Sequence, residues 1–189
     1  VEAGVDQLIH ARWYHSDPNQ GLDYTPDTVK QMVDQGQWVD TTIGHHLLGI
    51  EAKARGEIGP MDPHWAVSFK VVPEADHVET LNKMHDAGVR FTTGLDMGMT
   101  YGTHDRSAAN AWAFVETLGW ANWKAINAAT AGTAEALGLV KQIGSLQAGM
   151  FADMAAFAGD PAQNIRDMDQ ASTVVQSGRL LKLNDMILV

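Results

Sequence analysis

Two side chains in this sequence have the chemistry and the placement to work together in one site. His10 directly follows the apolar residues 5–9, and Asp96 closely follows the apolar residues 89–94. Both apolar segments have the length and composition of short β-strands. An imidazole can bind a metal ion or exchange a proton, and a carboxylate can do the same. The placement therefore predicts a catalytic site where strands end.

The residues between these two segments predict how the strands are arranged. Thr25-Pro26-Asp27 supplies the N-cap, the first-position proline and the early acid that begin a helix, which we expect to end at Gly36. We expect a strand at residues 38–43, a functional loop or one short strand within residues 44–73, and a second helix at residues 75–87. This alternation indicates parallel β/α units, whose functional groups sit at the carboxyl ends of the strands.

The remainder of the chain divides into a helical part and a β part. Residues 107–138 have helical patterning, and we expect the tryptophans within them, Trp112, Trp120 and Trp123, to be core residues. Residues 151–157 are strand-like, and residues 172–183 indicate a hairpin that turns at Ser177-Gly178. We therefore predict two domains, residues 1–140 and residues 141–189.

Composition narrows the classes of function. The formal net charge of −10 argues against a nucleic-acid partner and against binding to an anionic membrane surface. The chain has no cysteine, so any metal must be held by His, Asp, Glu or an unusual ligand. No apolar run reaches the roughly 18 residues of a membrane span, and no secretory signal is visible at the start, which favours a cytoplasmic location.

Five segments, taken in order, carry a resemblance to a known family. They are residues 4–10 (GVDQLIH), 86–96 (DAGVRFTTGLD), 125–139, 143–153 (IGSLQAGMFAD) and 174–179 (VVQSGR). Together they resemble the amidohydrolases, and most closely the imidazolonepropionase-like and Xaa-Pro dipeptidase-like members. The resemblance implies an α/β fold: the last three βα units of a (β/α)8 metal-dependent hydrolase barrel, plus part of a small β-sandwich appendage. One departure is Leu95, where the family usually has Thr or Ser.

The resemblance also implies roles for individual residues. His10 would be a ligand of a second metal ion or a hydrogen-bond donor to the substrate, and Asp96 would be the proton shuttle and a metal ligand. The metal would be one or two zinc ions, and His104, Tyr101 and Arg106 would contact the substrate from the loop after Asp96. The family's other ligands lie on earlier strands, before Val1, so we expect this chain to be a fragment. The adjacent His45 and His46 fit solvated loop residues better than site residues.

These inferences predict one function and leave two alternatives open. The parent enzyme is expected to hydrolyse a C–N bond (amide, peptide or lactam) in a small substrate with the help of divalent metal, and this chain alone is expected to be inactive. A deaminase of the same superfamily is one alternative. The other is a catalytically incomplete module that self-associates, because three strands of an open barrel leave bare sheet edges, and a homo-oligomer is expected for that reason.

Overall fold

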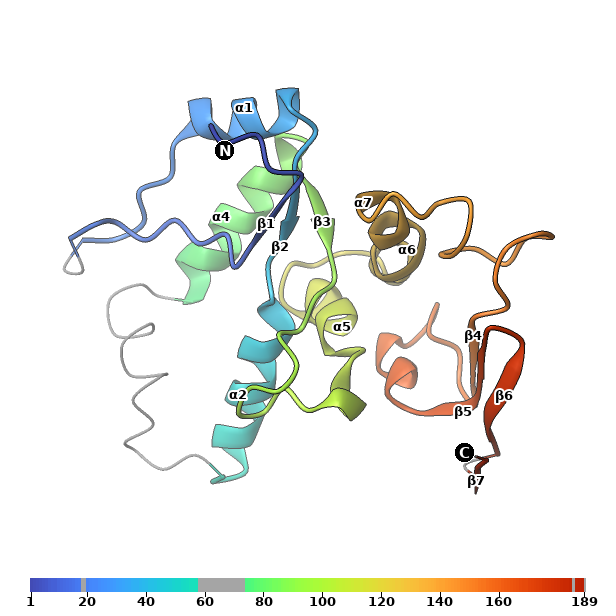
Figure 1. Cartoon of the computed structure of the whole chain (residues 1–189). Helices are drawn as coiled ribbons and strands as arrows, with labels where there is room; N and C mark the ends of the chain where they lie inside the picture. Colours follow the sequence, from blue (N-terminus) through green and yellow to red (C-terminus); the bar gives the residue numbers. More distant parts are fainter. Residues whose placement is uncertain (18–19, 58–73, 185, 189) are drawn as a thin grey trace.

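The computed structural model describes residues 1–17, 20–57, 74–184 and 186–188. Within them a parallel sheet has the order β1-β2-β3, in which β1 spans Gln7–Ile9, β2 spans Trp38–Asp40 and β3 spans Arg90–Thr92. Leu8, Val39 and Phe91 lie side by side in this register. All three strands run in the same direction, so their carboxyl ends share one edge, as the α/β pattern predicted (Figure 1).

Helix α1 (Pro26–Asp34) forms where the sequence predicts it. Pro26 occupies the first turn together with Asp27, and Val29 and Met32 are buried against the core. Gly36, with a φ of 66°, follows the helix and turns the chain into β2, a conformation that glycine adopts without steric cost. Helix α1 therefore supplies the crossover that keeps β1 and β2 parallel.

The expectation for residues 38–73 was partly wrong. Strand β2 ends at Asp40 rather than at residue 43, and helix α2 (Ile43–Ala54) begins where a loop was expected. Its apolar face, which includes Leu48 and Ala52, packs on α5 (Ala109–Glu116). The apolar residues 65–72 of the expected short strand lie outside the described residues.

The expected second helix and third strand are confirmed, with shorter bounds for the strand. Helix α4 (Glu74–Asp86) precedes β3, and Gly88 between them has a φ of 104°. The helical part of the chain after β3 divides into η1 (His104–Arg106), α5, α6 (Asn122–Asn127), a π-helical turn η2 (Ala128–Gly132) and α7 (Thr133–Ala136).

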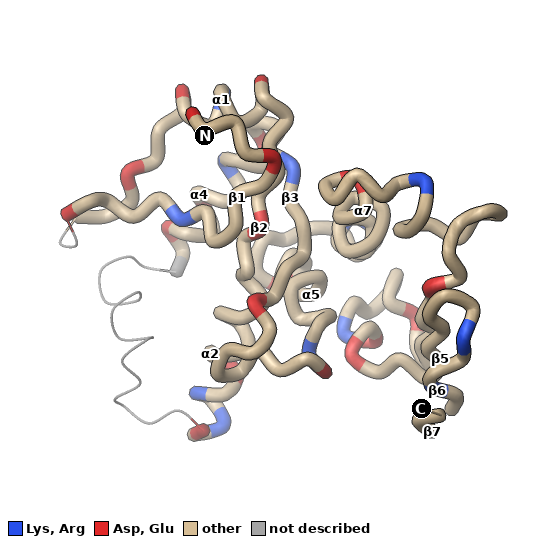
Figure 2. The backbone as a smooth tube through the Cα atoms, viewed as in Figure 1, with Lys and Arg blue, Asp and Glu red and all other residues tan. Residues whose placement is uncertain are grey.

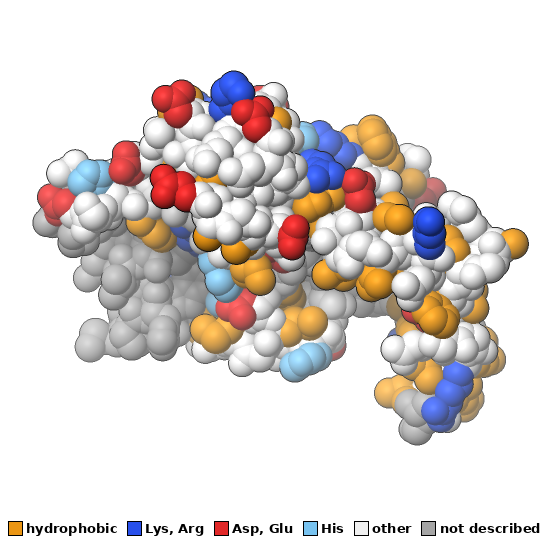
Figure 3. Space-filling view, turned by 45° about the horizontal axis from the view of Figure 1, so that its top comes forward, with side chains coloured by type: hydrophobic (Ala, Val, Ile, Leu, Met, Phe, Trp, Pro, Cys, Tyr) orange, Lys and Arg blue, Asp and Glu red, His pale blue; other side chains and the backbone are white. Residues whose placement is uncertain are grey.

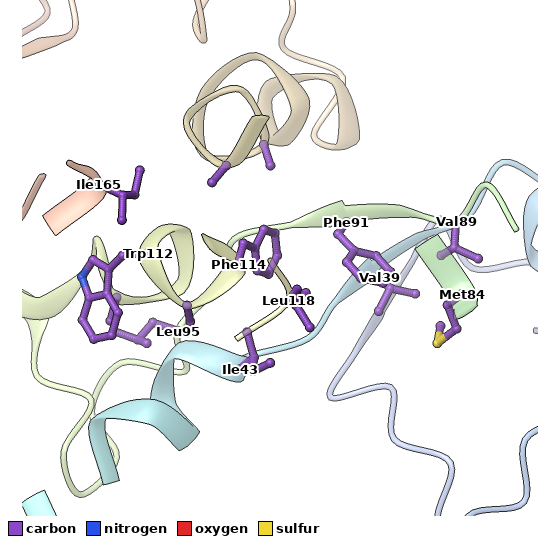
Figure 4. Close-up of a cluster of buried hydrophobic side chains, with 14 of the residues drawn as sticks. Val39, Ile43, Met84, Val89, Phe91, Leu95, Trp112, Phe114, Leu118 and Ile165 are labelled. Atoms are coloured by element: carbon purple, nitrogen blue, oxygen red, sulfur yellow. The ribbon is translucent and has the colours of Figure 1, made fainter. Parts of the chain in front are cut away.

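The hydrophobic core lies between the parallel sheet and these helices. Phe91 on β3 contacts Phe114 and Trp120, with ring centroids 6.1 and 5.9 Å apart, and Trp112 and Phe114 are fully buried (Figure 4). Trp112 is a core residue as expected. Trp123 is not, because 69% of it is exposed.

The tail forms a separate antiparallel sheet in the order β4-β5-β6-β7. The expected hairpin is confirmed: β5 (Ala171–Gln176) pairs with β6 (Arg179–Leu183) across Ser177-Gly178, both with positive φ. The flanking strands are β4 (Met154–Phe157), which is shorter than expected, and β7 (Met186–Ile187). A short helix η3 (Ile165–Asp169) joins β4 to β5 and places Ile165 in the main core (Figure 4).

The charges of the described residues are spread over much of the fold rather than gathered in one part of it. Lys and Arg do not line one face, and Asp and Glu are interspersed with them (Figure 2). In the part of the chain that the structure describes, no helix combines the length and the apolar character that a membrane crossing requires.

Candidate active site

His10 and Asp96 meet at the carboxyl edge of the parallel sheet. Imidazole Nε2 of His10 lies 3.7 Å from Oδ2 of Asp96, and their side chains are 50% and 41% exposed. They come from the residues after β1 and after β3, which are separated in the sheet by β2. The sequence-based expectation that these two side chains converge is therefore confirmed, and solvent reaches both of them.

A common backbone feature turns the chain out of each strand. His10, Thr42 and Asp96 follow β1, β2 and β3, and their φ angles are 57°, 48° and 58°. Residues other than glycine rarely adopt this left-handed conformation, which costs roughly 1–3 kcal/mol at each position. Because packing elsewhere must offset this cost, the three bends indicate a constrained site rather than loose loop ends.

Thr42 fixes the orientation of the His10 ring. Its hydroxyl oxygen lies 2.9 Å from Nδ1 of His10 and donates to the carbonyl oxygen of Thr41 at 2.8 Å. Since the hydroxyl has one proton and donates it to Thr41, Nδ1–H of His10 donates to the hydroxyl oxygen. The Nε2 lone pair of His10 is thereby directed toward Asp96, which is the tautomer that a metal ligand or a proton acceptor needs.

Asp40, the last residue of β2, accepts hydrogen bonds from the backbone at both His10 and Thr42. Its Oδ1 accepts from the backbone N–H of Thr42 at 3.0 Å, and its carbonyl oxygen accepts from the backbone N–H of His10 at 3.0 Å. Burial raises the pKa of the Asp40 carboxyl, while hydrogen bonds from Thr42, Gly94 and Thr92 and the nearby His10 imidazole oppose that rise. A buried carboxyl with these partners fixes backbone rather than binding substrate.

The hydrogen bonds around Asp40 continue across all three strands. Gln7 Nε2 donates to Thr92 Oγ1 at 2.6 Å, and the Thr92 side chain is hydrogen-bonded to the Asp40 carboxyl. A Cβ atom at Gly94 would lie 1.9 Å from Oδ2 of Asp40, so only glycine fits there. Gly94 thus lets the segment that carries Asp96 pass directly over the Asp40 carboxyl.

His45, in the first turn of α2, also belongs to this edge. Burial lowers its pKa, the Asp96 carboxylate opposes that change, and the positive charges of Arg12 and His10 add to it. Its Cδ2 atom would lie 3.1 Å from a Cβ placed on Gly102, so the loop after Asp96 packs closely on the ring. The expectation that His45 is a solvated loop residue was wrong, because it lies on a helix and is half-buried.

The three residues predicted to contact substrate are placed less centrally. His104 is exposed at the start of η1, and Tyr101 is half-buried with a φ of 108°. Arg106 is directed at the carboxylates of Glu51 and Asp169, at 3.8 and 3.9 Å. The structure does not test whether these three residues bind substrate, so that role stays a prediction.

The pair of His10 and Asp96 fits a metal ion as part of a ligand set. Two donor atoms 3.7 Å apart can both reach one ion at the usual ligand distances of roughly 2.0–2.2 Å, and the His10 lone pair is oriented for it. Within residues 1–17, 20–57, 74–184 and 186–188, however, no group of three His, Cys, Asp or Glu side chains could hold a metal. The described residues therefore supply two ligands, and a tight site needs at least one more.

Sequence reasoning missed Asp40 and Thr42, and it assigned His45 to a solvated loop. Extending the second strand to residue 43 placed Asp40 in the middle of an element, so its position at a strand end was not visible. The available signal was the pair Asp40-Thr41 followed by Thr42, since polar residues after a buried apolar run are typical of a strand's carboxyl end.

Comparisons with known proteins agree with this arrangement. The profile described as "Amidohydrolase family" matches residues 9–181. Among solved structures, a Xaa-Pro dipeptidase with bound methionine matches at a TM-score of 0.72 and 23% identity, over 96% of this chain and 41% of that chain. A Bifidobacterium longum protein described as a prolidase matches at 0.73 and 22%, over 96% and 43%.

An A. niger ochratoxinase matches at a TM-score of 0.69 and 22% identity, over 96% of this chain and 38% of that chain. The chain therefore spans about two fifths of the length of these solved proteins and shares the fold of that part. Among curated proteins, no significant match to the sequence was found.

Proposed function

Since this chain belongs to the amidohydrolase family, we propose that it carries part of an active site that hydrolyses a C–N bond, of the amide, peptide or lactam type, in a small substrate. The observation that supports this most directly is the approach of His10 Nε2 to Asp96 Oδ2 at 3.7 Å at the carboxyl edge of a parallel sheet. In this proposal β1, β2 and β3 are the last three strands of a (β/α)8 barrel, and β4–β7 belong to a β-sandwich appendage.

A divalent metal ion such as zinc, when bound, would polarise the scissile carbonyl and lower the pKa of water to about 7. His10 would hold that ion, or the substrate, through Nε2, because Thr42 occupies the Nδ1 side of its ring. Asp96 would accept the proton from the attacking water at one carboxylate oxygen and deliver it to the leaving nitrogen. Asp40 would keep both bends in place, as its hydrogen bonds to Thr42 and Gly94 allow.

The proposal is tested by assaying the full-length protein, with added divalent metal, on N-acyl amino acids, dipeptides and lactams. Asp96→Asn keeps the shape of the side chain but removes the proton acceptor, and we expect kcat to fall by a factor of about 10² or more. Asp34→Asn, on the exposed end of α1, is the matched control and should leave kcat unchanged. Unchanged hydrolysis after Asp96→Asn would show that Asp96 is not the proton shuttle.

A further inference from the structure

Among the described residues, a half-buried arginine beside the candidate active site has no acidic partner. Arg12 follows His10 by two residues, and in the described part of the chain no carboxylate lies within ion-pair distance of it. The other half-buried arginines each have an acidic partner: Arg90 contacts Glu135, and Arg106 and Arg166 both contact Glu51. A partly buried guanidinium without a carboxylate partner among the described residues is an available site for an external anion.

Arg12 lines a small cavity at the carboxyl edge of the sheet. The walls come from the segment after β1, the start of α2 and the first half of α4, and include Trp13, Ile43, His46, His77 and Leu81. The cavity has a volume of about 30 Å³, which is room for a group the size of a carboxylate or two water molecules. Its lining is mostly apolar, so an anion bound there would be partly removed from water.

The charges around the cavity favour a single negative group. Burial lowers the pKa of His46 to about 4 and also lowers the pKa of His77, with Arg12 adding to both shifts, so both rings are neutral at pH 7. Arg12 is then the only charged side chain among the described lining residues. One positive charge in a largely apolar cavity matches a monoanion such as a carboxylate.

A buried hydroxyl adds a hydrogen-bond donor to the guanidinium. Thr41, which lines the cavity, is 4% exposed, and its Oγ1 accepts from the backbone N–H of Ile43 at 3.3 Å. That bond uses an acceptor site and leaves the hydroxyl proton of Thr41 available to an anion. Thr42, the next residue, holds the His10 ring, so the cavity and the candidate active site are formed by the same two loops.

We propose that Arg12 and this cavity bind a carboxylate group of the substrate and so place its scissile C–N bond at His10 and Asp96. The inference rests on the proposed hydrolase function, and it narrows the substrate class to small N-acyl compounds that carry a free carboxylate. Arg12 is then the residue that sets specificity, and the reaction itself takes place at the neighbouring pair.

Binding is measured first, by isothermal titration calorimetry with N-acetylglycine and with the neutral N-acetylglycinamide. We expect the acid to bind at least tenfold more tightly than the amide, and Arg12→Gln to weaken binding of the acid about tenfold while leaving the amide unaffected. Arg12→Lys keeps the charge and should retain part of the preference. Arg179→Gln, which removes an exposed cation at the β5–β6 turn, is the control and should bind as the parent does.

Equal affinity for acid and amide, or an unchanged preference in a folded Arg12→Gln variant, would overturn the proposal. Circular dichroism of each variant establishes that it is folded. Hydrolysis assays on the full-length protein separate this inference from the function it rests on. If N-acyl amino acids are hydrolysed and Arg12→Gln leaves their KM unchanged, the carboxylate site is wrong and the hydrolase proposal stands. If nothing is hydrolysed but binding of the acid depends on Arg12, the carboxylate site stands and the hydrolase proposal is wrong.

Discussion

At the scale of single residues, the positions of His10 and Asp96 are fixed by hydrogen bonds and close packing of a few neighbouring residues. Asp40 and Thr42 are buried and Gly94 is half-buried, and each contacts His10 or a residue that positions His10 or Asp96. The geometry of the exposed pair therefore depends on neighbouring groups that are less exposed. Variants at these positions are the sharpest tests of how the site is built.

Replacing Gly94 with alanine tests the close approach to Asp40. The added Cβ would lie 1.9 Å from Oδ2 of Asp40, so either the carboxyl or the strand end must move. We expect Gly94→Ala to lower the free energy of unfolding by about 2 kcal/mol, as overpacking in a tight interior does. Urea denaturation measures this change, and Gly21→Ala is the control, because a Cβ there meets nothing within 4 Å. Equal effects of the two substitutions would contradict the predicted contact.

His46, one of two histidines that line the Arg12 cavity, gives a prediction for pH dependence. Burial lowers the pKa of His46 to about 4 in the folded protein. In the unfolded chain this imidazole becomes protonated near pH 6.5, whereas in the folded protein it stays neutral until the pH approaches 4. Stability from this residue is therefore complete above pH 6.5 and is lost as pH falls from 6.5 to 4, by up to about 3 kcal/mol.

Replacing His46 with asparagine should remove that part of the pH dependence. The measurement compares the free energy of unfolding at pH 7.5 and pH 4.5, so that any loss of packing common to both values cancels. His104→Asn, at an exposed position, should keep the dependence of the parent. A His46→Asn variant with the parent's full loss of stability on acidification would disprove the assignment.

At the scale of elements, the sequence predicts the helices and strands whose ends are set by local residues. It does not predict an element whose start depends on a residue far away in the sequence. Helix α1 and the β5–β6 hairpin carry their own signals in Pro26 and in Ser177-Gly178, and both were predicted correctly. Helix α2 carries no such signal. Its second residue, Gly44, donates its backbone N–H to Oδ1 of Asn110 at 2.6 Å, so the cap comes from a residue 66 positions away.

The residues of the candidate site also differ in whether local sequence predicts their placement. The placement of His10 and Asp96 follows from strand ends, which hydrophobic patterning reveals. The placement of His45 depends on α2, so it could not be read from the sequence once that helix was missed. The π-helical turn Ala128–Gly132 was likewise hidden inside a predicted helical stretch, because Ala, Thr and Gly in this order are compatible with an ordinary helix.

A cluster of charges joins the short helix η3 to α2 and α5. Arg166 lies over the Trp112 ring at 3.5 Å and contacts the carboxylates of Glu51, at 2.7 Å, and Glu116. Trp112 Nε1 donates to Asp169 Oδ1 at 2.8 Å. The hydrogen bonds with Glu116 and Glu51 raise the pKa of the Arg166 guanidinium, against an opposing effect of burial. They connect the segment that leads to the second sheet with the helices of the first.

Removing the charge of Arg166 should loosen this connection. In Arg166→Gln, Glu51 and Glu116 lose their shared partner, and we expect the free energy of unfolding to fall by about 1–2 kcal/mol. Amide hydrogen exchange should rise in residues 160–170 more than in β1–β3. Lys30→Gln, which breaks an exposed pair with Asp34 on α1, is the control and should leave the stability nearly unchanged. If the two variants behave alike, the cluster contributes no more than a surface ion pair.

At the scale of the whole molecule, the parallel sheet is open on both sides. Within the described residues, β1 and β3 each pair only with β2, which leaves two strand edges without partners. Large apolar side chains are exposed as well, Ile9 on β1 among them at 61%. Figure 3 shows hydrophobic side chains exposed in several places on one face of the molecule. Open edges beside exposed apolar side chains favour pairing with another strand.

We therefore predict that this chain on its own self-associates, with the β1 edge of one copy pairing against another copy. Light scattering at increasing concentration should report a mass above the 20.5 kDa of one chain. Ile9→Lys places a charge on the β1 edge and should shift the population toward monomer, because a lysine there opposes strand pairing. Leu146→Lys is the control: Leu146 is even more exposed, at 76%, but lies outside both sheets, so the variant should associate as the parent does. A parent chain that stays monomeric at high concentration would disprove pairing at this edge, and equal association of both variants would place the contact elsewhere.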